Sequence, residues 1–249
     1  NVIISLIIIF MVIVLIIGAA LLFMINQIKV ESTSNYSLTN EEIDEIIEDS
    51  KIILHSSIFS LDEEVAISNI ESLHSYVKVI SIERKFPSKV VINVTKRTPV
   101  FAMPLTDGSY ALLDRDLKVL ELVTEVNYSN ITIISGTKIE SVQLGVFITI
   151  AWLSNMLSEA EDLSFVNARF STFIPEITYV SVDDDYDLIY LKTNTGVILV
   201  LRNNAEGIGD YFNYAYTLYC DNTKITEEQK TYGYIYLNDE DVWGWTSSL

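Results

Sequence analysis

The chain opens with an unbroken run of apolar residues. Residues 2–25 contain no charged side chain, and a helix of that length, rising about 1.5 Å per residue, crosses a hydrocarbon core of roughly 30 Å. The run is longer than the apolar region of a cleavable signal peptide, and no small-residue cleavage site follows it. The pattern predicts an uncleaved transmembrane helix over residues 1–25.

Two short amphipathic helices are expected next. Thr39 and Glu42 have the spacing of a capping box, as do Ser60 and Glu63, and such a box opens a helix by satisfying its first backbone N–H groups. Behind each box, apolar residues recur three or four positions apart with acidic residues between them. Each helix should therefore have one apolar face.

From residue 77 the apolar positions alternate, which is the period of a β-strand. Two alternating runs, 77–86 and 89–95, meet at Pro87, whose fixed φ suits the second position of a turn. They predict a hairpin whose apolar face is covered by the two helices. That face is expected to contain Ile80, Ile82, Val90, Ile92 and Val94. With residues 27–31 as a first strand, the element order is β-α-α-β-β.

The remainder of the chain, residues 99–249, has the pattern of short strands. Asp107-Gly108 is a strong turn signal between two of them. Another turn, Asn194-Thr195-Gly196, separates strands predicted over 187–193 and 197–202. We therefore predict an α+β fold in which the β-α-α-β-β domain precedes a mainly antiparallel β domain with flanking helices.

The flanking helices and a terminal hairpin complete this second domain. Apolar spacing predicts one helix over 142–157, and a Tyr-rich segment predicts another over 211–219. Two arms, 233–237 and 242–246, flank the polar turn 238–241 and predict a hairpin close to the end of the chain. Its second arm is expected at a sheet edge, where unpaired backbone groups can accept a partner's strand.

Composition narrows the possible functions. The chain has 16 Lys and Arg against 34 Asp and Glu, a formal net charge of -18, which repels phosphate backbones and argues against nucleic acid as a partner. Cys220 is the only cysteine, so no internal disulfide can form, and it is expected to pack as a small apolar residue. With only His55 and His74 besides, zinc coordination is not expected.

The sequence shows no pattern that indicates an enzyme. A nucleophile with its base, a metal cluster and a phosphate-binding loop are all missing from it. Residues 183–187 imitate the start of a calcium-binding EF-hand loop, but Leu188 replaces the required glycine and Asn194 the closing glutamate. We interpret this stretch as a solvated acidic turn and predict no catalytic residue, metal or cofactor.

A local excess of positive charge lies on and around the first hairpin. One interpretation is that lysines at a sheet edge discourage unwanted strand pairing. The other is a docking face for an acidic partner or an anionic lipid. The residues concerned are Arg84, Lys85, Lys89, Lys96 and Arg97.

Several of these segments together resemble the FtsQ/DivIB family of bacterial cell-division proteins. Residues 79–87 (VISIERKFP) and 94–100 (VTKRTPV) resemble the hairpin of the POTRA domain of that family, except that Lys96 stands where the family usually has an acid. Residues 107–114 (DGSYALLD) and 187–202 resemble elements of its beta domain. The resemblance implies an anchor over 1–25, a POTRA domain over 26–98 and a beta domain over 99–249.

The function implied by this resemblance is a non-enzymatic scaffold of the bacterial divisome. Its expected partners are FtsL-like and FtsB/DivIC-like coiled-coil membrane proteins, in a complex that regulates septal peptidoglycan synthesis. The expected location is the cell membrane at the division septum, with a single pass and the domains outside the cytoplasm. Two other interpretations stay open: a POTRA-containing assembly or secretion factor, and an anchored extracytoplasmic ligand-binding protein or enzyme.

The resemblance also implies where a partner binds. The FtsB-like contact is expected in the terminal hairpin, whose two tryptophans fall on the same side of their strand. Large amphipathic rings serve either as core filler or as interface anchors, and both roles remain open here. The predicted partner-binding residues are Tyr234, Ile235, Tyr236, Leu237, Val242, Trp243, Gly244 and Trp245.

Overall fold

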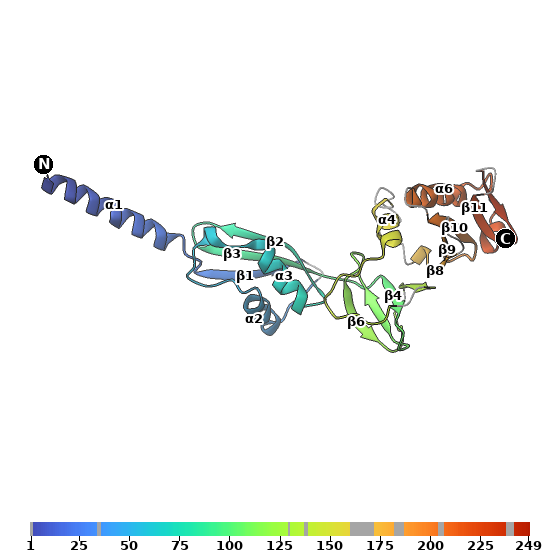
Figure 1. Cartoon of the computed structure of the whole chain (residues 1–249), viewed down its shortest axis with the longest axis horizontal. Helices are drawn as coiled ribbons and strands as arrows, with labels where there is room; N and C mark the ends of the chain where they lie inside the picture. The colour runs from blue at the N-terminus through green and yellow to red at the C-terminus, as the bar shows by residue number, and fades with distance from the viewer. Residues whose placement is uncertain are drawn as a thin grey trace. The chain divides into compact units, whose positions relative to one another are not determined.

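The computed structural model describes residues 2–33, 36–128, 130–136, 139–159, 172–181, 187–203, 207–237 and 242–249. The chain divides into two compact units, Asn1–Arg97 and Thr98–Leu249, and each has a hydrophobic core of its own. Figure 1 shows the order of the helices and strands along the chain.

The first helix, α1 (Val2–Leu22), has 21 residues and no acidic or basic side chain in its terminal turns. It ends at Leu22 rather than near residue 25, because the backbone of the following residues bonds elsewhere: Ile25 N–H donates to Ser56 O (2.9 Å) and Asn26 N–H to Ser88 O (2.8 Å). Within the described residues, no helix combines the length and hydropathy needed to cross a membrane, so the predicted span is not confirmed.

After α1, the first unit has the predicted β-α-α-β-β order. Its three-stranded sheet has the order β1-β3-β2, with β1 parallel and β2 antiparallel to the central strand. The helix α2 packs against β1, α3 packs against β2, and the two helices contact each other. The elements are β1 (Gln27–Ser32), α2 (Asn40–Asp49), the 3-10 turn η1 (Ile58–Ser60), α3 (Glu63–Leu73), β2 (Val77–Lys85) and β3 (Lys89–Lys96).

One of the two predicted capping boxes is confirmed. The Thr39 hydroxyl accepts from Glu42 N–H (3.2 Å), and the Glu42 carboxylate accepts from Thr39 N–H (2.7 Å). The second box is wrong, because Ser60 belongs to η1 and the chain is extended at Leu61. Asp62 caps α3 instead, and its Oδ1 accepts from Val65 N–H (3.1 Å).

The predicted apolar face of the hairpin is correct except at Ile80. A β-bulge shifts the β2–β3 register between Val79 and Ser81, and a bulge moves the following residues to the opposite face. Val79 and Ile82 are therefore buried, while Ile80 is exposed. On the partner strand Val90, Ile92 and Val94 are buried as expected.

The second unit is built on a mixed, nine-stranded sheet with the order β12-β11-β10-β9-β8-β7-β4-β5-β6. Pairings are antiparallel except β10–β11, β7–β8 and β4–β7. The strands are β4 (Phe101–Pro104), β5 (Tyr110–Leu113), β6 (Val119–Val123), β7 (Thr132–Ser135), β8 (Glu176–Ser181), β9 (Asp187–Lys192), β10 (Ile198–Asn203), β11 (Tyr234–Leu237) and β12 (Trp243–Thr246).

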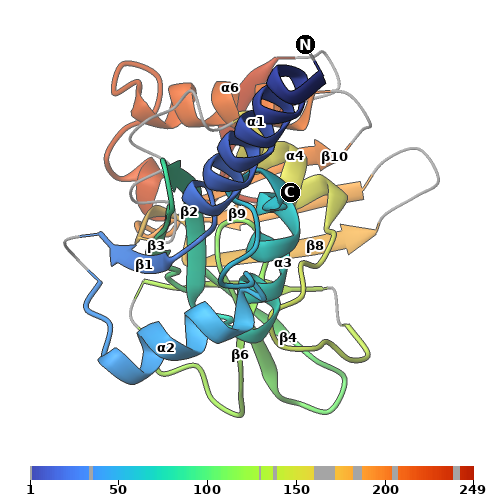
Figure 2. The same ribbon diagram turned by 90° about the vertical axis from the view of Figure 1, so that its left-hand side faces the viewer.

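Two helices, α4 (Ala151–Glu159) and α6 (Ile208–Cys220), share the main core of this sheet. The helix α6 packs on β10, β11 and β12, and α4 packs beside α6. Figure 2 shows both helices together with β8, β9 and β10. The short 3-10 turn η3 (Gln229–Thr231) precedes β11. At Gly196 the φ angle is +120°, and an added Cβ would lie 2.3 Å from Thr231 O, so only glycine fits this turn.

The predicted helix over 142–157 is wrong in its first half. Gly145 has a φ of +77°, and the segment around it runs alongside β6. Gly145 N–H donates to Val119 O (2.8 Å), and Val119 N–H donates to Val146 O (2.9 Å). Pairing with the sheet has overridden the helical spacing, and α4 begins only at Ala151. The Tyr-rich helix over 211–219 is confirmed as part of α6.

Candidate partner-binding edge

The predicted terminal hairpin is present, and β12 lies at one end of the nine-stranded sheet. The strands β11 and β12 are antiparallel, with Ile235 opposite Trp245 and Leu237 opposite Trp243. The expected turn, 238–241, lies outside the described residues. One side of β12 thus pairs with β11, and among the described residues no strand lies on its other side.

The edge at β12 differs from the other sheet edges of the chain. At the far end of the same sheet, residues 145–148 cover part of β6, where Lys118 bridges to Phe147. In the first unit both edge strands carry protective features: β1 contains the charged residues Lys29 and Glu31, and β2 has a bulge and the lysines Lys78 and Lys85. Such features oppose strand addition. The sequence of β12, WGWT, contains no charge and no proline, and its pairing shows no bulge. In the described structure this edge lacks those protections.

The two tryptophans face the core of their own unit and stay half-buried. The Trp245 indole N–H lies within hydrogen-bonding distance of two carbonyl oxygens, Gln229 O (3.0 Å) and Tyr232 O (3.1 Å). Its ring packs edge-on against Tyr232 at 5.2 Å. Trp243 lies 6.0 Å from the Tyr211 ring of α6. Both rings therefore fix the edge strand in place, and their uncovered parts are open to a partner.

A hollow of about 350 Å³ opens beside this edge, between α6 and the start of β12. Its floor combines apolar side chains with one acid and one base from the end of α6 and the following turn. Asp221 there accepts hydrogen bonds from the N–H and hydroxyl of Thr223, which lower the pKa of its carboxyl group. The lining residues are Tyr214, Thr217, Leu218, Asp221, Lys224, Val242 and Trp243.

The tyrosines of β11 point away from the tryptophans, because successive side chains of a strand alternate between faces. Tyr234 is in register with Ile198 on β10, and Val200, two residues further along β10, lies opposite Tyr190 on β9. Burial of Tyr190 raises the pKa of its hydroxyl group, and the nearby Tyr234 raises this pKa further. The predicted residues Tyr234 and Tyr236 thus belong to a second face of the edge, separate from that of Trp243 and Trp245.

The basic cluster of the first hairpin is largely neutralised. Arg97 is buried, and its Nη2 lies 2.7 Å from Glu71 Oε2. Arg84 pairs with Glu63 at 3.1 Å, and Lys85 pairs closely with Glu83, which raises the pKa of that lysine. These pairs weaken the hypothesis of a strongly positive docking face.

Arg97 has a structural function that the sequence did not reveal. Its Nε donates to Val77 O (3.2 Å), while Glu71 Oε1 accepts from Val79 N–H (2.8 Å). The Arg97–Glu71 pair therefore ties the end of β3 to α3 and to the bulged part of β2. A basic residue directly before Thr98-Pro99, at the end of an alternating run, was the only signal for it.

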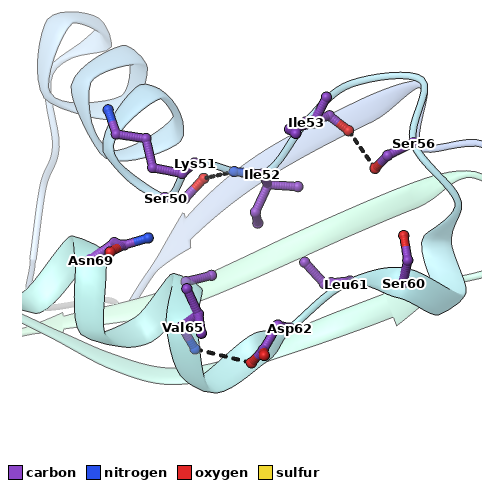
Figure 3. A pocket seen from close by; sticks show the side chains of 11 residues that line it. Ser50, Lys51, Ile52, Ile53, Ser56, Ser60, Leu61, Asp62, Val65 and Asn69 are labelled. Atoms are coloured by element: carbon purple, nitrogen blue, oxygen red, sulfur yellow. Dashed lines mark hydrogen bonds between the residues drawn. The ribbon is translucent and has the colours of Figure 1, made fainter.

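No catalytic constellation emerges in the part of the chain that the structure describes. A pocket of about 220 Å³ lies between α2, α3 and the loop joining them (Figure 3). Its polar groups serve local turns: Asp62 accepts from Val65 N–H, Ser50 Oγ from Ile52 N–H, and Ser56 Oγ donates to Ile53 O. Within the described ranges no three His, Cys, Asp or Glu residues could share a metal ion.

The other residues considered in the sequence are the acidic stretch, Cys220 and His74. Residues 183–186 of the acidic stretch lie outside the described residues. Cys220 is exposed rather than packed. His74 ends α3, and its Nε2 lies 2.9 Å from Asp49 Oδ2.

A three-stranded sheet with two helices, in the order β-α-α-β-β, places the first unit among small α+β domains of the POTRA type. Comparison with known families narrows this class, because residues 23–97 match the family model of the FtsQ-type POTRA domain. No curated protein shows a significant match to the chain. Residues 23–97 are thus a POTRA domain of the FtsQ type, as the sequence motifs predicted, and this domain points to a role in cell division.

Proposed function

We propose that the protein is a non-enzymatic, membrane-anchored scaffold of the bacterial divisome. The FtsQ-type POTRA domain supports the assignment to cell division. The sequence of α1, which has no charged residue, supports an anchor in the cell membrane, with both units outside the cytoplasm at the division septum. Partner binding then requires no chemistry from the chain, only exposed surfaces on folded domains.

The proposed binding surface is the edge of β12. A partner segment in extended conformation adds to this edge as a further strand, and main-chain hydrogen bonds supply affinity while alternate side chains supply specificity. The observation that carries the proposal is an uncharged, unbulged edge strand next to a hollow of about 350 Å³. The expected partners are FtsL-like and FtsB/DivIC-like coiled-coil membrane proteins.

The two faces of the edge contact different side chains of the added strand. Side chains of the added strand that point toward α6 meet Val242, Trp243 and the hollow, while those that point away meet Tyr236. An apolar side chain that fills the hollow beside a half-buried tryptophan has the features of a binding hot spot, for which truncation costs about 2 kcal/mol or more.

Gly244 provides a substitution that tests this surface without disturbing the fold. A Cβ built at Gly244 meets no atom within 4 Å, and a lysine on an edge strand opposes strand pairing. Gly244→Lys should reduce co-purification of the two small coiled-coil proteins from detergent-solubilised membranes by tenfold or so, the equivalent of about 1.4 kcal/mol.

The matched control is Leu122→Lys, which places the same charge at a residue of β6, the opposite edge strand, that is 42% exposed. This control should leave recovery unchanged. Equal recovery with both variants would contradict the assignment of the partner site to β12, and failure of the original chain to recover either coiled-coil protein would contradict the scaffold function.

A further inference from the structure

Three phenylalanines gather at the point where the chain leaves α1. Phe23 is the first residue after this helix, Phe59 lies in η1, and Phe86 lies at the turn of the β2–β3 hairpin. The ring centroids are 5.3 Å apart for Phe23–Phe59, 6.1 Å for Phe23–Phe86 and 5.5 Å for Phe59–Phe86. Although they touch one another, Phe59 and Phe86 remain 62% and 58% exposed. We name this group the aromatic tip.

The aromatic tip is held at the end of α1 by backbone hydrogen bonds on both sides of the exiting chain. On one side, Ile58 N–H donates to Phe23 O (2.9 Å) and His55 N–H donates to Ile25 O (2.8 Å). On the other side, Asn26 N–H donates to Ser88 O in the hairpin turn (2.8 Å). The segment between α1 and β1 is therefore built into the first unit, and Phe59 and Phe86 stay close to Phe23.

We propose that the aromatic tip rests in the interfacial layer of the bilayer in which α1 is anchored. This proposal rests on the membrane anchoring proposed above. One residue of chain reaches at most about 3.6 Å, so Phe23 cannot leave the membrane surface when α1 ends there. The contacts among the three rings then bring Phe59 and Phe86 to the same depth.

Lipid is the occupant that the chemistry of the tip favours. Apolar rings presented at the surface of a folded domain are buried favourably at the boundary between headgroups and acyl chains. Two of the basic residues next to the tip are paired with acids, Lys85 with Glu83 and Arg84 with Glu63. By contrast, six of the ten residues of α2, NEEIDEIIED, are acidic, and an anionic bilayer repels such a face.

A consequence follows for the orientation of the POTRA domain. A single flexible tether would let the domain rotate freely above the membrane. Insertion of the aromatic tip beside the exit of α1 adds a second point of attachment and fixes which face of the domain is presented to partners.

Nitroxide labels in the full chain, reconstituted alone in liposomes of phosphatidylethanolamine and phosphatidylglycerol, test the proposal. In a Cys220→Ser background, single cysteines are placed by Phe59→Cys, Leu73→Cys or Val12→Cys. Leu73, at the end of α3, is 62% exposed like Phe59, which makes it a matched control. Power-saturation measurements compare collisions with oxygen, which enriches in lipid, and with a nickel chelate, which stays in water.

We expect a several-fold higher ratio of oxygen to nickel accessibility at position 59 than at position 73, and the highest ratio at position 12. A high ratio at 12 with equal, water-like ratios at 59 and 73 would overturn the inference and leave the anchor in place. Low accessibility to both reagents at 59 would mean that protein covers the tip, which also overturns it. A water-like ratio at 12 would overturn both the anchor and the inference.

Discussion

Replacement of Arg97 by methionine should unfold the POTRA domain more readily than any change at a surface ion pair. The Arg97 side chain is 3% exposed and that of Glu71 is 12% exposed, so the substitution leaves a carboxylate in the interior without its cation. Removing one partner of a buried pair costs about 3–5 kcal/mol. The lost hydrogen bond to Val77 O adds about 1 kcal/mol.

Hydrogen exchange measured by mass spectrometry on the full chain in detergent micelles separates this domain from the second unit. A loss of about 4 kcal/mol corresponds to roughly thousandfold faster exchange of the β3 amides, because each 1.4 kcal/mol is a factor of about ten. Amides of the second unit should be unaffected. The double variant Arg97→Met with Glu71→Gln has a neutral side chain at position 71, so it should recover part of the stability that Arg97→Met loses.

Arg84→Ala is the internal control for this experiment. The Arg84–Glu63 pair has a similar distance of 3.1 Å, but its side chains are 34% and 39% exposed. A pair of that exposure contributes at most about 1 kcal/mol, which predicts less than about fivefold acceleration. If the two arginine variants exchange at the same rate, the Arg97–Glu71 pair does not hold the domain together as described.

Three further predictions follow from the same structure. Ile82→Ala should destabilise the first unit by about 2–4 kcal/mol and Ile80→Ala by less than about 0.5 kcal/mol; equal denaturation midpoints would disprove the bulge. Trp245→Phe removes the indole donor facing Gln229 O and Tyr232 O and should lower the free energy of unfolding of the second unit by about 1–2 kcal/mol. An unchanged melting temperature would show that this contact does not stabilise the unit. Hydrogen bonds from Thr39 lower the pKa of Glu42 below its ordinary 4.5, so the capping box stabilises α2 above that pH, and this contribution is lost as the pH falls through the folded pKa. The protection of the α2 amides from hydrogen exchange should therefore decrease at acid pH, and Glu42→Gln should reduce this pH dependence. Identical pH profiles for the two proteins would refute the prediction.

The alternation of apolar residues predicted the first domain well because one face of its sheet carries the hydrophobic core of that domain. The burial of Val90, Ile92 and Val94 could be predicted from their alternation alone. The exposure of Ile80 could not be predicted in this way, because a bulge depends on how β2 pairs with its partner strand and cannot be seen in the pattern of one strand. The partner of Arg97 was equally hidden, because Glu71 lies 26 residues earlier on a helix.

In the second domain, local turn chemistry was the reliable signal. Gly108 and Gly196 both have positive φ angles and both separate paired strands as predicted. The helical spacing of residues 142–150 failed, because backbone pairing with β6 outweighs a weak local preference. The hairpin near residue 240 was predicted from its turn residues, and the expected position of its second arm at a sheet edge is confirmed by the order of the strands.

The hollow beside β12 could not have been found from the sequence. It is formed by Tyr214, Thr217 and Leu218 from α6 together with Val242 and Trp243, and the spacing of these residues carries no shared motif. Only the packing of α6 across β11 and β12 brings the two segments together.

The central claim is that β12 receives a strand from a coiled-coil membrane partner. Its most direct test is a photo-crosslinking amino acid at Val242, an exposed residue directly before β12, compared in living cells with the same probe at Leu122 on the opposite edge strand. The account predicts a crosslink to a small coiled-coil membrane protein from position 242 and none from position 122. Crosslinks from position 122 alone, or from neither position while the protein is at the septum, would contradict it.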